Sequence, residues 1–133
     1  MLVHLNRIIL TIFISVDITP ESTYYGSMRE AFEMVDDEVG ESEFSIISRP
    51  PKHILDYYLE QFELEPEFVI GAWHTNELDK DAISDLDSEV IVVMALQGGW
   101  ILEESRPILE DSGYVIDPDL FQEEGDTVWV WRK

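Results

Sequence analysis

Carboxylate side chains occur along the whole length of this chain, and they constrain its fold more than any other feature. The chain has 29 Asp and Glu residues against 8 Lys and Arg, which gives a formal net charge of −21 over 133 residues. Mutual repulsion of like charges destabilises a compact state. Because the acids are spread along the chain and are not collected in a tail, we expect a folded domain with a strongly acidic surface.

The composition indicates that such a chain can still build a core. Hydrophobic residues make up 45% of it and aromatic residues 11%, which argues against general disorder. The length suits one domain, so we expect residues 1–133 to form a single acidic globular domain. The chain contains no cysteine, which excludes disulfides and thiolate sites and favours a cytoplasmic location.

Apolar periodicity and turn residues predict six strands and three helices. The expected strands are residues 7–16, 43–49, 67–75, 89–96, 113–116 and 127–132. The expected helices are residues 21–39, 52–64 and 100–112, with residues 76–87 a polar loop that holds one helical turn. The apolar run 8–16 reads as a buried strand, because no small-residue cleavage site follows it and it is too short to span a bilayer.

This order of elements, β-α-β-α-β-β-α-β-β, predicts an α+β fold. We expect a two-layer sandwich, in which a mixed or antiparallel sheet of about five or six strands is covered on one side by three helices. In the first helix, the apolar stripe should be Met28, Phe32, Val35 and Val39, and Gly40 should end the helix.

The third helix and the last strand carry two further signals. Gly113 can end the helix, and Pro107 either kinks it or lies in its first turn. Trp129 and Trp131 share one face of the last strand, opposite two valines, and we expect them mainly in the core.

Two of the predicted helices place acidic residues at helical spacing. In the first helix and just beyond its end these are Glu30, Glu33, Asp37 and Glu41. In the second helix and beyond it they are Asp56, Glu60, Glu63 and Glu67. Like charges at this spacing destabilise a helix by about 0.2–0.5 kcal/mol per pair. No Lys or Arg occurs between His53 and Asp79 to offset the second set.

These two acidic stripes predict a surface that imitates a nucleic acid. Duplex DNA presents about one charge per 1.7 Å of its axis, and lines of carboxylates can occupy a basic groove in a nuclease or a nucleic-acid-binding complex. The same net charge disfavours direct binding to nucleic acid or to an anionic membrane. We therefore expect a non-enzymatic inhibitor with a basic protein as its partner and no cofactor. The expected partner-binding residues are those of both stripes together with Tyr57.

In charge and size, the chain resembles the small acidic inhibitors that phages and plasmids use against host nucleases, anti-CRISPR and anti-restriction proteins among them. No motif carries this resemblance, so it transfers no functional residue. An alternative is an immunity protein or antitoxin that neutralises one basic toxin through a hot spot around Asp56, Tyr57 and Tyr58. A further alternative is a halophilic small enzyme or ligand-binding domain, which the low count of three Lys residues favours.

Catalytic and metal-binding patterns do not occur in the sequence. It has no G-x-S-x-G, H-E-x-x-H or Walker motif, and its three histidines lack ligand spacing. Residues 79–89 have part of the acidic spacing of a calcium loop. However, Ile83 stands at a ligand position and Val90 stands where the bidentate Glu belongs. We therefore predict no catalytic residue and no metal site.

Overall fold

The computed structural model describes residues 28–49, 52–72, 77–96, 99–117, 121–123 and 126–133. Its helices are α2 (Met28–Val39), α3 (Lys52–Gln61), α4 (Lys80–Ser84) and α5 (Trp100–Asp111). Its strands are β1 (Phe44–Ser48), β2 (Val69–Gly71), β3 (Val90–Leu96), β4 (Val115–Ile116), β5 (Phe121–Glu123) and β6 (Asp126–Arg132). The predicted strand 7–16 and the predicted beginning of the first helix lie outside the described residues.

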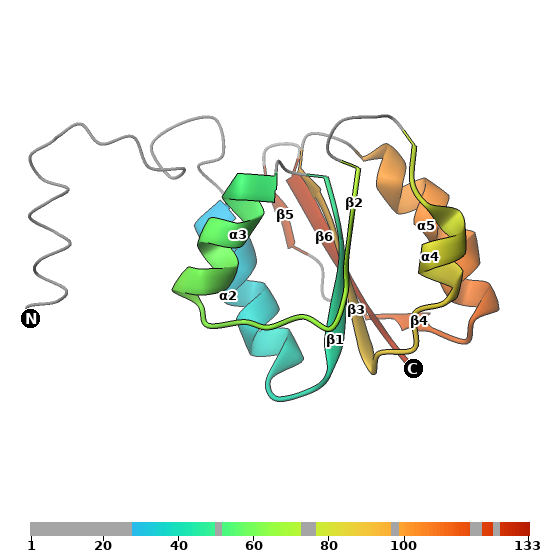
Figure 1. Ribbon diagram of the computed structural model, residues 1–133, viewed down its shortest axis with the longest axis horizontal. Coiled ribbons are helices and arrows are strands. Elements are labelled where there is room, and N and C mark those ends of the chain that lie inside the picture. The colour runs from blue at the N-terminus through green and yellow to red at the C-terminus, as the bar shows by residue number, and fades with distance from the viewer. Residues whose placement is uncertain (1–27, 50–51, 73–76, 97–98, 118–120, 124–125) are drawn as a thin grey trace, which may run out of the picture.

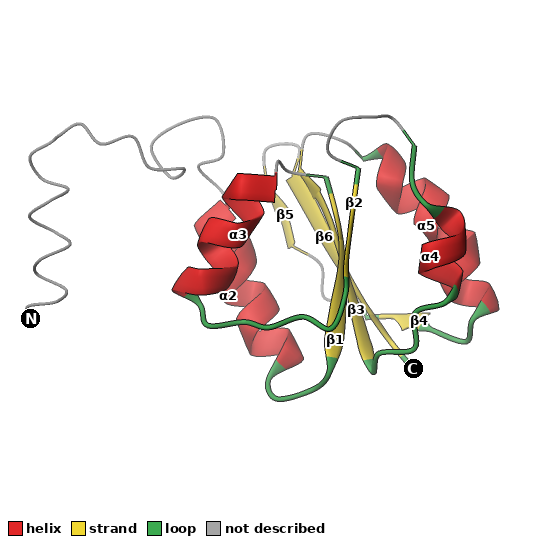
Figure 2. Cartoon of the chain, in the orientation of Figure 1, coloured by secondary structure: helices red, strands yellow, loops and turns green. Residues whose placement is uncertain are grey.

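One mixed sheet joins these strands (Figure 2). Its order is β2-β1-β3-β6-β4, and β5 also pairs with β6. Strand β1 runs parallel to β2 and β3, whereas β6 runs antiparallel to β3, β4 and β5. The predicted α+β class with a mixed sheet of about six strands is therefore confirmed.

Helices lie on both faces of the sheet, α2 and α3 on one face and α4 and α5 on the other (Figure 1). The structure thus has three layers and differs from the expected two-layer sandwich. The reason is that β3 is apolar on both faces, and helices must shield each apolar face from water. Val90, Val92 and Met94 belong to the core under α2 and α3, and Ile91, Val93 and Ala95 to the core under α4 and α5.

Helix α2 follows the prediction closely over its described residues. Its stripe of Met28, Phe32, Val35 and Val39 is buried against the sheet. The helix ends at Val39, and Gly40 follows with a φ of +53°, which is the left-handed conformation that commonly ends a helix.

Arg132, at the end of β6, ties this helix to the sheet. Its Nη2 donates to the Glu38 carboxylate at 2.7 Å and to the Glu38 carbonyl at 2.9 Å, and its Nε donates to Asp117 at 3.2 Å. The last turn of α2 has no basic residue of its own, so Arg132 supplies the cation that suits a helix C-terminus. Burial acts to lower the pKa of Arg132, but its hydrogen bonds to Glu38 and Asp117 outweigh burial and raise that pKa.

The other layer also agrees with most local predictions. The predicted helical turn within residues 76–87 is α4, and the Asp79 carboxylate caps it by accepting from the Ala82 N–H at 3.0 Å. Pro107 lies inside α5 and not in its first turn. Trp131 is buried in the core of this layer, and Trp129 is partly buried against it, so both tryptophans pack on the core as expected.

Candidate partner-binding site

The candidate site begins where helix α3 ends. The N–H of Glu63 donates to the Glu60 carbonyl at 3.1 Å, and the N–H of Leu64 donates to the Leu59 carbonyl at 2.9 Å. This pair of bonds defines a Schellman turn, whose left-handed residue is usually glycine. Here that residue is Glu63, with a φ of +55°, and no other non-glycine residue that the structure describes has a positive φ. The turn ends α3 at Gln61, earlier than the predicted end at residue 64.

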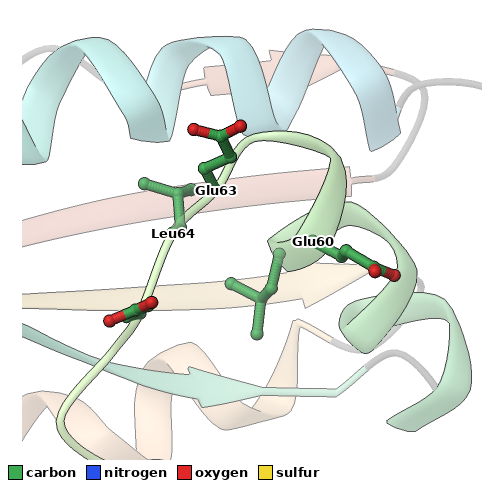
Figure 3. Close-up of a pocket in the computed structure, with 5 residues that line it drawn as sticks. Glu60, Glu63 and Leu64 are labelled. Atoms are coloured by element: carbon green, nitrogen blue, oxygen red, sulfur yellow. The ribbon is translucent and has the colours of Figure 1, made fainter. Parts of the chain in front are cut away.

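This turn borders a hollow of about 440 Å³, lined by Leu59, Glu60, Glu63, Leu64 and Glu65 (Figure 3). The two leucines are partly buried against the core, and the three glutamates are exposed. The carboxylates of Glu60 and Glu63 project in different directions (Figure 3). Such a hollow suits a Lys or Arg side chain, whose apolar stem can cover the leucines while its charged head meets carboxylates.

Helix α3 contributes a negative potential to this hollow as well as side chains. The hollow lies at the C-terminal end of the helix, where the aligned peptide dipoles give a partial negative charge. The last turn of α3 contains no basic residue. The hollow therefore combines three carboxylates with the negative end of a helix dipole.

Helix α2 lies beside α3 and adds a second acidic surface. The Phe32 and Tyr58 rings stack across the two helices with their centroids 5.3 Å apart. Glu30, Glu33 and Asp37 are exposed on the side of α2 that faces away from its buried stripe. The two acidic surfaces thus belong to the same helical layer, as the prediction of these two helices on one side of the sheet implies.

The predicted partner-binding carboxylates are all exposed, but neither stripe is helical over its full length, and Glu41 of the first stripe lies in the turn beyond α2. The exposed residues are Glu30, Glu33, Asp37, Glu41, Asp56, Glu60, Glu63 and Glu67. The second stripe is interrupted because α3 ends before Glu63, so Glu63 lies in the turn and Glu67 lies just before β2. Glu67 also accepts a hydrogen bond from the Ser88 hydroxyl, which directs its carboxylate toward the protein.

The two adjacent tyrosines of α3 differ in exposure. Tyr57 is half-buried, and its ring meets the Tyr58 ring edge-on with centroids 4.9 Å apart. Tyr58 is fully buried in the core under α2 and α3. It therefore cannot belong to the surface hot spot that the immunity-protein alternative places around Asp56, Tyr57 and Tyr58.

The basic side chains of the described residues leave most of these acids without an ion pair. The ion pairs found there are Lys52–Asp56, Lys80–Glu104, Arg106–Glu110, Arg132–Glu38 and Arg132–Asp117. Asp56, 2.7 Å from Lys52, is the one stripe residue among them. In the described part of the chain, the carboxylates of the hollow and of the outer side of α2 therefore keep their charge available to a partner.

Sequence reasoning missed Glu65, which lines the hollow although it does not fit a helical stripe. A search for residues at helical spacing could not find it, because it follows the turn that ends α3. Within the described residues, no group of three or more His, Asp or Glu side chains is placed to hold a metal ion. None of the helices described is both long and apolar enough to cross a membrane.

No protein-family model matches the chain, and neither a curated protein nor a solved structure matches it. The functional assignment therefore rests on the geometry and the electrostatics of the hollow and of helix α2.

Proposed function

We propose that this protein is a non-enzymatic inhibitor that binds a basic, nucleic-acid-binding surface of a nuclease or defence complex. The observation that carries the proposal is the conformation of Glu63 at the rim of the acidic hollow. The left-handed conformation costs an L-residue about 1–2 kcal/mol relative to the right-handed one. Backbone strain that is kept at one position supports a functional role for the side chain there.

In the proposed complex, a Lys or Arg of the partner enters the hollow. Its aliphatic stem packs on Leu59 and Leu64, and its head pairs with the Glu63 carboxylate, while Glu60 and Glu65 add to the negative potential of the hollow. The head also meets the negative end of the α3 dipole. This contact gives the complex a defined anchor, which a diffuse acidic surface lacks.

The outer side of α2 has a different role in the proposed complex. Its exposed acids Glu30, Glu33 and Asp37 attract the basic surface from a distance and raise the rate of association. They occupy the place that the phosphates of a nucleic acid would take, and binding releases counterions from both partners. Affinity should therefore fall as the salt concentration rises, as it does for DNA.

The test compares two charge-reversal variants of equal size. One replaces the three glutamates of the hollow, as Glu60→Lys, Glu63→Lys and Glu65→Lys. The matched control replaces three exposed acids of α5, as Glu103→Lys, Glu110→Lys and Asp111→Lys. Each variant and the unchanged protein are immobilised, host lysate is passed over them, and bound proteins are eluted with a salt gradient and identified by mass spectrometry. The nuclease activity of each captured enzyme is then assayed with and without the soluble protein.

We expect the unchanged protein and the α5 control to capture and inhibit the same basic nucleic-acid enzyme. The hollow variant should bind it more weakly by about tenfold or more, which corresponds to a loss of at least about 1.4 kcal/mol. Equal losses in both variants would show that only total charge matters and would contradict the site. Capture of unrelated basic proteins, none of them inhibited, would contradict the function.

A further inference from the structure

Strand β2 forms one edge of the sheet and pairs with β1 alone among the described strands. The Phe68 carbonyl accepts from a β1 N–H at 2.9 Å, and the Ala72 N–H donates to a β1 carbonyl at 3.0 Å. In a parallel pair, alternate residues direct both backbone groups toward the neighbouring strand. The N–H and C=O groups of Val69 and Gly71 therefore point away from β1, toward the side of β2 on which no described strand lies.

Apolar side chains accompany these free backbone groups. Phe68 is 58% exposed and Val69 is 36% exposed, which places both among the most exposed large hydrophobic residues described. A hollow of about 340 Å³ lies between β2 and α4, and it is lined by Phe68, Val69, Ile70, Ala82, Asp85 and Leu86. A strand added beside β2 would direct every second side chain toward this hollow.

Acidic residues surround the free edge. Glu65 is exposed before β2, and Asp81 and Asp85 are exposed on and after α4. Short edge strands with charged neighbours prevent pairing with another copy of the same chain, because a second copy would bring the same acids together. A basic segment meets no such repulsion, so the charges select for a basic occupant.

We infer that β2 receives an extended segment of the basic partner as an added strand. Backbone hydrogen bonds to Val69 and Gly71 hold the segment, and its alternate residues are aliphatic and fill the hollow beside α4. Its remaining residues are Lys or Arg and face the acids around the edge. This inference rests on the proposed basic partner and adds a second contact to the Lys or Arg in the hollow at the end of α3.

The test uses a capped octapeptide of alternating lysine and valine as its probe. The matched control is the same peptide with every backbone nitrogen methylated, which keeps the side chains and the charge but cannot form a strand ladder. NMR titration gives the two affinities, and amide hydrogen exchange of the full chain shows which backbone groups become protected.

We expect the unmethylated peptide to slow exchange at the Val69 and Gly71 amides and to leave the Ile70 amide, which already faces β1, unchanged. It should bind at least about tenfold more tightly than the methylated peptide, a difference of about 1.4 kcal/mol. Equal binding of the two peptides would overturn the added strand but would not contradict the proposed inhibitor function. Absence of binding by either peptide would also overturn the added strand. So would protection of the Val69 amide that appears without peptide as the protein concentration rises, because the occupant would then be a second copy of the chain.

Two variants test the same contact from the protein side. Val69→Pro removes a free N–H without breaking a bond to β1, and proline is tolerated on the free side of an edge strand. Val69→Thr keeps the N–H and serves as the control. The proline variant should lose peptide binding while the threonine variant keeps it; if the proline variant does not fold, the two peptides decide the question alone. The capture experiment on the α3 hollow is separate, so failure of the proposed function would be recognised independently.

Discussion

Helices α3 and α5 end in the same hydrogen-bonded turn but place different residues in its left-handed position. In α5, the Gly113 amide and the amide after it each bond back to a carbonyl of the last turn at 3.0 Å. In α3, the Glu63 amide and the amide after it make the corresponding bonds at 3.1 and 2.9 Å. Glycine adopts this conformation without steric cost, whereas glutamate does not.

The residue in the left-handed position differs between turns that border a hollow and turns that do not. The α2 and α5 helices both end in glycines of positive φ, Gly40 and Gly113, and neither glycine lines either of the two hollows described above. The α3 turn borders the acidic hollow, and there the chain has a carboxylate at the strained position. The comparison indicates that backbone stability is lost at Glu63 in exchange for a negative charge at that point. Substitutions at Gly113 and Glu63 test it.

The largest expected effect comes from Gly113→Glu, which gives α5 the residue of α3. The φ of Gly113 is +93°, beyond the region of about +50° to +70° that L-residues can enter. A Cβ at this position meets no atom within 4 Å, so the cost arises from the backbone alone. We expect the free energy of unfolding to fall by about 1–2 kcal/mol, measured by urea denaturation.

Gly113→Asn is the matched control, because asparagine tolerates the left-handed conformation better than glutamate. It should lose clearly less stability than the glutamate variant. If the glutamate variant is as stable as the unchanged protein, this turn tolerates an L-residue in its left-handed position. The conformation of Glu63 would then not be strained.

The residue after each turn offers a second comparison. In α5 it is Tyr114, which is buried and donates its hydroxyl to the Ser88 carbonyl at 2.6 Å. In α3 it is Leu64, which has no hydroxyl and lines the hollow. Tyr114→Phe should lower the free energy of unfolding by about 0.5–1.5 kcal/mol, because a buried hydrogen bond is lost.

This tyrosine also gives a prediction for alkaline pH. Burial first, and then the charges of Asp87 and Glu67, raise the pKa of Tyr114 above its ordinary value of 10.0. The unfolded chain releases the proton first as the pH rises, so this contribution to stability is complete below pH 10 and declines above it. The phenylalanine variant should lose less stability between neutral pH and pH 11 than the unchanged protein. Identical alkaline slopes would mean that Tyr114 titrates normally.

Local sequence signals were enough to predict many elements of the fold. The apolar stripe of α2 and the alternation along β6 follow from the 3.6- and 2-residue periods of helix and strand, and Gly40 and Gly113 mark helix ends by their residue type. Both elements of the second helical layer, α4 and α5, were predicted, but their position on the opposite face of the sheet was not. Which face of a sheet a helix covers depends on the path of the chain, and residue spacing does not encode that path.

The candidate site was predictable only in part for a related reason. Glu30, Glu33 and Asp37 are exposed on one side of α2 as their spacing indicates. The second stripe was not predictable as it stands, because a glutamate in a left-handed turn carries no signal in the sequence comparable to glycine. The hollow forms only when that turn brings Glu65 and two leucines together, and its shape is therefore a property of the folded chain.

The smallest expected change in stability, and the most informative, comes from Glu63→Gly. Glycine relieves about 1–2 kcal/mol of strain but loses about 0.5–1 kcal/mol through the greater freedom of the unfolded chain. The difference predicts a gain of about 0–1.5 kcal/mol in the free energy of unfolding. The same variant removes one of three carboxylates from the hollow, so it should bind the basic partner more weakly. Stability and binding are therefore expected to change in opposite directions.

Glu63→Gln separates the two effects, because glutamine keeps the size and the backbone strain of glutamate but removes its charge. We expect its stability to match that of the unchanged protein and its binding to fall as in the glycine variant. If glutamine binds as well as glutamate, the charge at residue 63 is unimportant and the strain needs another cause. If glycine binds as well as glutamate and is also more stable, the chain gains nothing from glutamate in this turn, and the hollow at the end of α3 is not the contact.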